Sequence, residues 1–329
     1  SSLDREANVV RIGGPSGPTF SFDQAFDGQS PQEFVFQSRV APLIERCLEG
    51  YNATVLAYGQ TGSGKTHTIM GPSTALQDGE SAGLIPRAVR TLFDSLQKQS
   101  VDTVGKEQPH DLEMDQTVYD YEVRVQFLEL YGETIRDLLT PKPSSEKLTI
   151  RDIGNEEPEV LGATQQRVDS ADEALLCLTR GMLRRVTAET AMNSTSSRSH
   201  AILSVMVQQT STFDGYTQVK RSKFSFVDLA GSERLKRTQA QGQRMKEGVD
   251  INKGLLVLGN VISALGDETK QGKTFVPYRD SKLTRLLKGS LGGNHKTLMI
   301  ACVSPSSNNL EESLNCLRYA NRAKNIQNN

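Results

Sequence analysis

The stretch Gly59-Gln60-Thr61-Gly62-Ser63-Gly64-Lys65-Thr66 decides the fold class of this 329-residue chain. It matches the pattern G-x-x-x-x-G-K-[ST], whose glycines let the backbone curl so that successive N–H groups point inward at phosphate oxygens. Lys65 is expected to reach the β- and γ-phosphates of a nucleotide, and the Thr66 hydroxyl to ligate Mg²⁺. At ordinary residue frequencies, a chain of this length contains such a match by accident about once in a hundred. The motif therefore predicts nucleotide binding.

The segments around this loop alternate between strand-like and helix-like patterns. A short apolar run at 53–58 precedes the loop, as expected for a strand buried on both faces. Further strands are predicted at 19–23, 121–127, 201–207, 224–229 and 297–303. Helices are predicted at 33–48, where Pro42 is expected to introduce a kink, from about Lys65, and at 84–96, 171–183, 249–265 and 310–326. The polar segment 97–116 is interpreted as an exposed insertion. This order predicts one α/β domain, a P-loop NTPase fold with a mostly parallel central β-sheet flanked by helices on both faces.

Composition restricts the classes of function. The chain is 36% hydrophobic and 23% charged with a net charge of −1, so it lacks the basic excess typical of nucleic-acid binders. It contains no run of 18 apolar residues, and its first five residues lack the apolar core of a signal peptide, so neither a membrane span nor export is expected. The cysteines, Cys47, Cys177, Cys302 and Cys316, have no metal-ligand spacing, and we expect buried free thiols in a reducing compartment.

Two later segments supply what hydrolysis needs beyond phosphate binding. The apolar run 224–227 ends at Asp228, and Gly231 follows three residues later. Asp228 is placed to hold Mg²⁺, and the Gly231 N–H to bond a γ-phosphate and be released with it, which makes a switch. The polar run 193–200 offers hydroxyl groups for metal and water and one arginine, although a flexible hydroxyl-rich loop is the alternative interpretation.

Several motifs occur in one order along nearly the whole chain. They are 57–68 around the phosphate loop, 193–200, Asp228-Leu229-Ala230-Gly231-Ser232-Glu233-Arg234, 260–265 and 277–287. The first three resemble the phosphate loop and the two switches of the kinesin family, and the likeness extends from about residue 20 to residue 325. This resemblance implies a motor domain at 1–325 that binds microtubules and hydrolyses ATP with Mg²⁺ to ADP and phosphate.

The resemblance also implies roles for individual residues. Ser197 would ligate Mg²⁺ and help to activate the lytic water, and Ser196 would help to position that water. Arg198 and Glu233 would form a salt bridge that closes the switches over the γ-phosphate. His67 would lie near the adenine ring, with an ordinary helix residue as the alternative.

Basic residues late in the chain are candidates for contacting the acidic microtubule surface. The candidates are Lys236, Arg237, Lys270, Lys273, Arg279 and Lys282. An ordinary solvated charged face is the alternative, but the family match at Arg279 and Lys282 favours microtubule contact.

The end of the chain carries a further likeness. Residues 326–329 resemble the start of the neck linker in kinesins whose motor is N-terminal, which implies plus-end movement along the cytoskeleton in the cytoplasm. The segment 298–305 resembles the corresponding sequence of the kinesin-4 group. A dimer is expected only through a coiled coil outside this chain, and neither nucleic acid nor membrane is expected as a direct partner.

One departure and several alternatives stay open. Kinesins begin with a strand carrying an Arg-x-Arg-Pro segment that packs on adenine, and its absence here puts base contacts on that side in doubt. A small GTPase would need N-K-x-D, whereas Asn252-Lys253-Gly254-Leu255 lacks the acid. A microtubule-binding scaffold with an inactive nucleotide site is disfavoured because the expected phosphate-site residues are all present, and a nucleic-acid motor is disfavoured by the neutral net charge. A regulator that hydrolyses ATP at microtubule tips without walking remains open.

Overall fold

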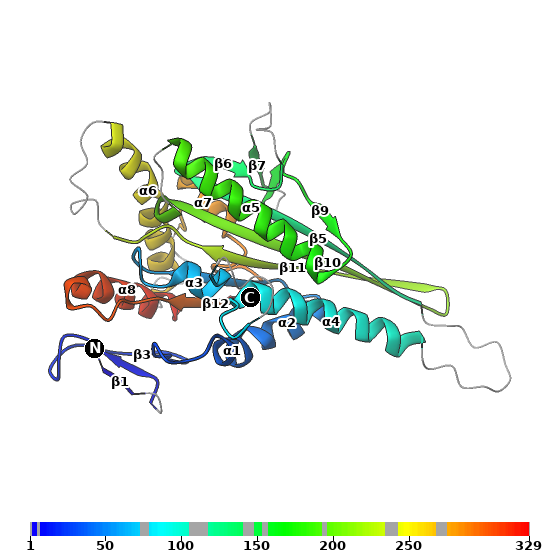
Figure 1. The fold of residues 1–329 in the computed structure, drawn as a ribbon, viewed down its shortest axis with the longest axis horizontal. Coiled ribbons are helices and arrows are strands. Elements are labelled where there is room, and N and C mark those ends of the chain that lie inside the picture. Colours follow the sequence, from blue (N-terminus) through cyan, green and yellow to red (C-terminus); the bar gives the residue numbers. More distant parts are fainter. Residues whose placement is uncertain are drawn as a thin grey trace.

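The computed structural model describes residues 2–4, 7–72, 79–104, 118–140, 148–152, 157–192, 196–233, 243–267 and 275–328. Its centre is a seven-stranded sheet (Figure 1) in the order β12-β4-β11-β10-β5-β6, with β9 paired to β5. The strands are β4 (Ala53–Tyr58), β5 (Val118–Tyr131), β6 (Thr134–Asp137), β9 (Gln166–Val168), β10 (Ser199–Phe213), β11 (Tyr216–Asp228) and β12 (Lys296–Ala301).

The sheet is mixed in direction. Strands β12, β4 and β11 run parallel, whereas the pairs β11–β10, β10–β5, β5–β6 and β5–β9 are antiparallel. The α/β class with a P-loop is as predicted, but the expectation of a mostly parallel sheet holds only for those three strands. Strands β10 and β11 form one long hairpin through Asp214 and Gly215, whose φ angles are 49° and 72°. Because a two-residue turn with positive φ at both positions matches the twist of paired strands, an Asp-Gly pair suits it.

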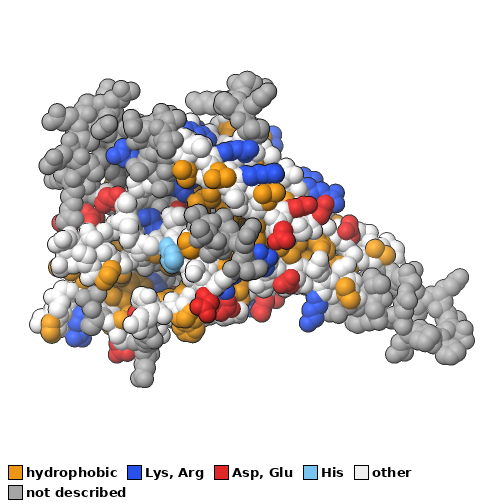
Figure 2. Space-filling model, viewed as in Figure 1, with side chains coloured by type: hydrophobic (Ala, Val, Ile, Leu, Met, Phe, Trp, Pro, Cys, Tyr) orange, Lys and Arg blue, Asp and Glu red, His pale blue; other side chains and the backbone are white. Residues whose placement is uncertain are grey.

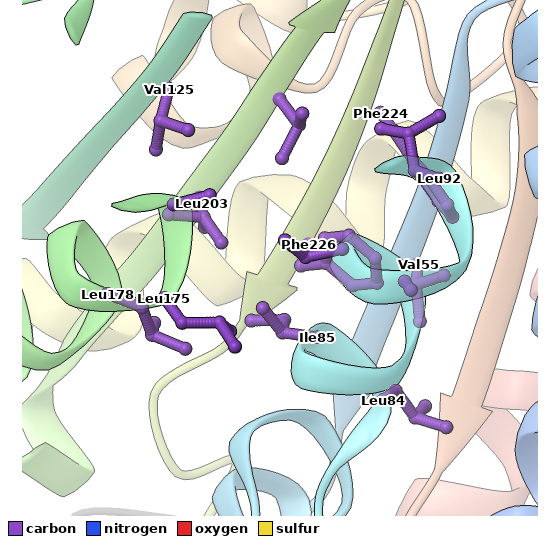
Figure 3. Close-up of a cluster of buried hydrophobic side chains, with 14 of the residues drawn as sticks. Val55, Leu84, Ile85, Leu92, Val125, Leu175, Leu178, Leu203, Phe224 and Phe226 are labelled. Atoms are coloured by element: carbon purple, nitrogen blue, oxygen red, sulfur yellow. The ribbon is translucent and has the colours of Figure 1, made fainter. Parts of the chain in front are cut away.

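Alternation along the buried strands builds two cores, one on each face of the sheet. Val55 and Phe226 belong to the first core, and their neighbours Leu56 and Val227 to the second. The first core is closed by α2 (Ala41–Leu48), α4 (Leu84–Val104) and α5 (Ala171–Met192), and Figure 3 shows Leu84, Ile85, Leu92, Leu175 and Leu178 meeting the strand side chains. The second core is closed by α6 (Gln243–Leu265), α7 (Lys282–Leu286) and α8 (Leu310–Ala323). All four cysteines are buried, as expected.

The elements differ in length from the sequence predictions. The helix expected at 33–48 is divided into α1 (Gln32–Val35), a π-helical turn η1 (Phe36–Val40) and α2, so the irregularity predicted near Pro42 is present. Helix α4 continues through Val104, so the expectation of an insertion from residue 97 was wrong for 97–104. The rest of that segment, 105–116, lies outside the described residues. Helix α5 continues nine residues beyond the predicted end at 183, and this extension positions a buried arginine of the site.

Among the described residues, two small sheets and several single 3₁₀ turns lie outside the central sheet. Strands β1 (Ser2–Asp4), β2 (Val9–Arg11) and β3 (Thr19–Ser21) form a separate antiparallel sheet, so the strand predicted at 19–23 does not join the central one. This small sheet lies beside α8 (Figure 1), where Lys324 Nζ donates to the Ser21 carbonyl oxygen at 3.4 Å. Strands β7 (Thr149–Arg151) and β8 (Glu159–Leu161) form a two-stranded ribbon. Single 3₁₀ turns lie at η2 (Ser196–Arg198), η4 (Tyr278–Asp280) and η5 (Ser307–Asn309).

The surface is mixed in character. Figure 2 shows acidic and basic side chains interspersed over the visible face, which fits a net charge of −1. Across the ranges that the structure describes, no helix combines the length and apolar character needed to cross a bilayer.

Candidate nucleotide and switch site

The phosphate loop leaves the carboxyl end of β4 and enters the short helix α3 (Lys65–Met70). Strands β11 and β12 flank β4 in parallel and end at the same edge of the sheet, since Asp228 pairs with Ala57 and Ala301 with Tyr58. Gly64, which precedes α3, has φ 101°, a backbone conformation that glycine adopts without strain. The fold therefore brings the loop and the predicted metal acid to one edge, where ligands bind in open α/β sheets.

Lys65 is the buried cation of the loop. Its side chain is 7% exposed, and Nζ donates to the carbonyl oxygens of Gly59 at 2.8 Å and Gln60 at 2.9 Å. Burial lowers the pKa of Lys65, and the neighbouring carboxylates of Asp228 and Glu233 oppose that shift. The ammonium group is thus already held in position by the start of the loop, so it can bind phosphate oxygens without a further loss of side-chain freedom.

Asp228 and Thr66 form the candidate metal site. The Thr66 hydroxyl donates to Asp228 Oδ2 at 2.7 Å, which brings two hard oxygen ligands together. Asp228 is 2% exposed, and its second oxygen, Oδ1, is buried and accepts no hydrogen bond from any residue that the structure describes. A buried carboxylate oxygen needs a partner, so this donor set fits Mg²⁺ with its bound water.

Arg185, in the part of α5 that extends beyond the predicted end of the helix, is a functional residue that the sequence reasoning missed. It is 1% exposed and lies between two buried carboxylates, with Nη1 3.4 Å from Asp228 Oδ2 and Nε 3.6 Å from Glu129 Oε1. Its guanidinium also donates to the Ser199 carbonyl oxygen at 3.0 Å. Arg185 therefore contacts the same Asp228 oxygen, Oδ2, that accepts from Thr66, and it offsets the charge of both acids.

His200, the second residue of β10, was expected only as the end of a polar run. It is fully buried, and its Nδ1 accepts a hydrogen bond from the Ala230 N–H at 3.0 Å. Burial, reinforced by the charges of Arg185 and Lys65, lowers the pKa of His200 from 6.5 to about 3. A neutral His200 thus holds the backbone one residue before Gly231.

We expect this histidine to make the fold sensitive to mild acid. Because the pKa of His200 is about 3 in the folded chain and 6.5 when unfolded, the unfolded chain takes up the proton first. Stability is complete above about pH 6.5 and is lost as the pH falls toward 3, by about 2 kcal/mol at about pH 5. Urea unfolding at neutral pH and at about pH 5 measures this loss.

The matched variants separate this effect from general acid sensitivity. His200→Asn should remove most of the pH dependence in that range, whereas His67→Asn, at an exposed position, should retain it. Glu157, whose pKa is lowered to about 2 by His295 and Lys223 against the effect of burial, loses its contribution only at more acidic pH. An unchanged pH dependence in His200→Asn would contradict the assignment.

The second switch lies directly on the phosphate loop. The Gly231 N–H donates to the Ser197 carbonyl oxygen at 2.8 Å, and the Ser232 N–H to the Gly59 carbonyl oxygen at 3.1 Å. The Glu233 carboxylate accepts from Thr61, from the backbone N–H at 2.9 Å and from the hydroxyl at 2.5 Å. The two switches and the loop are thus joined, but within the described part of the chain Glu233 is paired with Thr61. The salt bridge expected between Arg198 and Glu233 remains a prediction about another state of the switch.

The other predicted nucleotide contacts are placed as follows. Ser196, Ser197 and Arg198 form η2 immediately before β10. His67 is exposed on α3, and its carbonyl oxygen accepts from Gln32 Nε2 of α1 at 2.8 Å. This contact ties α1 to the helix that follows the phosphate loop, on the side where adenine is expected.

The candidate filament contacts are only partly described. Arg279 in η4 has 82% of its side chain exposed and lies 3.9 Å from Asp152, whereas Arg285 is half-buried against the same carboxylate. Lys282 begins α7, and its backbone N–H donates to Glu133 Oε2 at 2.9 Å. Lys236, Arg237, Lys270 and Lys273 lie outside the described residues.

Residues 326–328 are fixed to the second core. Ile326 packs against that core beyond the end of α8. Asn328 Nδ2 donates to the carbonyl oxygens of His295 at 2.7 Å and Ser290 at 3.0 Å, and Oδ1 accepts from the Gly292 N–H at 2.8 Å. Within α8, Tyr319 stacks on Tyr58 with ring centroids 4.1 Å apart, which connects this helix to the root of the phosphate loop.

Comparisons with known proteins agree with this geometry. A sequence model of the kinesin motor domain matches residues 6–326. The chromosome-associated kinesin KIF4A of Homo sapiens is 50% identical over 311 residues, which are 94% of this chain and 24% of that protein. The kinesin-like protein kif7 of Danio rerio is 47% identical over 329 residues, or 99% of this chain and 23% of that protein. The chain thus spans about a quarter of the length of these curated relatives. The solved structure of a fast kinesin matches with a TM-score of 0.82 and 38% identity, covering 98% of this chain and 86% of that one.

Proposed function

Because this chain belongs to the kinesin motor domain family, as its motifs predicted, we propose that it is a microtubule-dependent motor ATPase. It hydrolyses Mg-ATP to ADP and phosphate, and its nucleotide state sets its affinity for the microtubule. One arrangement supports this proposal. The buried Lys65 lies in the phosphate loop, the Thr66 hydroxyl donates to Asp228, and the Gly231 N–H of the second switch donates to the Ser197 carbonyl oxygen. That arrangement provides phosphate binding, a metal site and a sensor in one place.

Catalysis in this site is positioning and charge stabilisation. When bound, Mg²⁺ neutralises the charge that develops on the phosphate oxygens. Thr66 and Ser197 would hold it directly, and Asp228 through water. Residues 59–66 bind the phosphates through backbone N–H groups, and the Lys65 ammonium group is held by the Gly59 carbonyl oxygen at the start of the loop. Ser196 and Ser197 orient the lytic water, and Arg198 pairs with Glu233 when the switches close.

The second switch is coupled to the elements proposed to face the microtubule and to residues 326–329. Helix α6 follows the second switch and packs in the second core with α7, α8 and Ile326. A movement of Gly231 and its neighbours would therefore move α6, and through the second core it would affect the contacts that hold residues 326–328. We propose that 1–325 is the motor domain and that 326–329 begin a neck linker, with movement toward the plus end. Dimerisation through a coiled coil outside this chain, a cytoplasmic location on microtubules and no direct nucleic-acid contact belong to the same proposal.

The test is steady-state ATPase activity with and without taxol-stabilised microtubules. Strong stimulation by microtubules would support a motor cycle. Microtubule binding without stimulated turnover would instead favour a scaffold and would contradict force production. Gliding of surface-attached protein on microtubules separates a motor from a regulator that hydrolyses ATP without walking.

Charge reversal at Lys282 should weaken the approach to the acidic filament. Arg279→Glu with Lys282→Glu is expected to raise the microtubule concentration for half-maximal activation roughly tenfold at low salt, since each reversal replaces attraction by repulsion. The effect should shrink as salt rises, because exposed charges are screened. Turnover without microtubules should not change.

The control is Arg180→Glu, an exposed reversal on α5. Unchanged microtubule affinity in the double variant, or an equal effect of the control, would show that η4 and α7 do not face the filament.

A further inference from the structure

Glu233 of the second switch is paired with Thr61 of the phosphate loop. Each oxygen of the Glu233 carboxylate accepts one hydrogen bond from the same phosphate-loop residue, Oε2 from the Thr61 N–H at 2.9 Å and Oε1 from the Thr61 hydroxyl at 2.5 Å. Hydrogen bonds to an ionised acceptor are short and stronger than neutral ones. A two-point contact of this kind fixes both the place and the orientation of the carboxylate.

The backbone of the second switch is built tightly around this contact. A Cβ added at Gly231 would collide with Thr61 Oγ1 and with both carboxylate oxygens of Glu233, so a side chain there would have to displace the contact between Thr61 and Glu233. The same glycine donates to the Ser197 carbonyl oxygen, and Ser232 donates to Gly59. The second switch is therefore attached to the phosphate loop at Ser232 and Glu233, and to η2 at Gly231. Among these contacts within the described residues, Thr61 supplies the side chain on the phosphate-loop side.

Phosphate binding does not require a threonine at this position. Thr61 occupies one of the four variable positions of G-x-x-x-x-G-K-[ST], where the backbone N–H groups and the lysine bind the phosphates. The hydroxyl of Thr61 is directed at Glu233, so its chemistry serves the switch.

We infer that Thr61 is a positioning residue that holds the Glu233 carboxylate on the phosphate loop in the open switch, and that closure requires Glu233 to leave Thr61 for Arg198. A two-point pair with an arginine uses both carboxylate oxygens, and these are the two atoms that Thr61 engages. Thr61 thus sets the equilibrium between open and closed switches. This inference rests on the proposed ATPase function for its catalytic consequence, but the contact itself can be tested without turnover.

The experiment compares Thr61→Val, which lacks the hydroxyl donor, with Thr61→Ser, which keeps it. Single-turnover hydrolysis of ATP without microtubules should be accelerated about fivefold in Thr61→Val, because a hydrogen bond to a charged acceptor is lost from the open state alone. Thr61→Ser should remain close to the wild type. A merely structural role of the hydroxyl would lower the rate or leave it unchanged.

Hydrogen exchange provides the second readout and needs no ATP turnover. In the ADP-loaded protein, the amides of Gly231 and Ser232 should exchange several-fold faster in Thr61→Val than in the wild type or Thr61→Ser, because the open switch loses one anchor. Equal exchange in all three proteins would overturn the inference, as would slower hydrolysis in Thr61→Val. If the wild type shows no ATPase activity, the proposed function fails, and exchange alone then decides whether Thr61 holds the switch.

Discussion

Replacing Lys65 by alanine is expected to lower ATP turnover at least about a hundredfold, with or without microtubules. The ammonium group is buried and held by the Gly59 and Gln60 carbonyl oxygens, so its charge is already in place when phosphates arrive. A hundredfold loss corresponds to about 2.7 kcal/mol of transition-state stabilisation. Steady-state kinetics with purified protein measure the loss, and retention of ADP after gel filtration reports nucleotide binding separately.

Lys288→Ala is the matched control, because Lys288 is a half-buried lysine outside the phosphate loop. It should turn over ATP like the wild type. Turnover of Lys65→Ala within about threefold of the wild type would remove Lys65 from the catalytic site, provided that its circular dichroism spectrum shows an intact fold.

The second large effect is expected at Arg185. Arg185→Met should reduce the free energy of unfolding by about 3–5 kcal/mol, since it leaves the buried carboxylates of Asp228 and Glu129 without their shared cation. Urea unfolding measures this loss. This loss of unfolding free energy measures the cost of leaving buried carboxylates without Arg185. It is larger than the net contribution of the intact ionic group to stability.

Arg180→Met on the same helix replaces an exposed arginine and should change stability by less than about 0.5 kcal/mol. Equal losses in the two variants would mean that the effect comes from helix α5 itself. Arg185→Met together with Glu129→Leu should recover part of the loss, because the second carboxylate that faced Arg185 is then removed. Arg136, which pairs with the other Glu129 oxygen at 3.5 Å, is 27% exposed and keeps access to solvent.

The sequence predicts a phosphate site from one short segment, because the chemistry of such a site is local. The glycines, Lys65 and Thr66 lie within eight residues, and the strand before them is mostly apolar and is buried at every position. Asp228 was found because it ends an apolar strand, where the parallel neighbours β4 and β11 bring it to the loop. A short motif between two regular elements leaves few alternatives for its geometry.

Arg185 and Thr61 could not be assigned in the same way, because their roles depend on contacts between distant segments. Arg185 follows the residue at which periodicity predicted the end of a helix, and Glu129 and Asp228 are 56 and 43 residues away from it. The direction of strands also depends on connections: Asp214 and Gly215 form a two-residue hairpin turn, which makes β10 and β11 antiparallel. That Asp-Gly pair is a signal from which the mixed sheet could have been predicted.

The anchoring of Asn328 has an energetic consequence for the tail. Fixing the backbone of residues 326–328 opposes docking by about 3–6 kcal/mol, whereas the side-chain hydrogen bonds of Asn328 together contribute about 2–6 kcal/mol, at about 1 kcal/mol each. Burial of Ile326 adds a further contribution of similar size to one of these bonds. The two sides nearly cancel, so the docked and released tails are close in free energy. Loss of two of these hydrogen bonds, about 1–3 kcal/mol, is therefore of the size needed to release residues 326–328 from the second core.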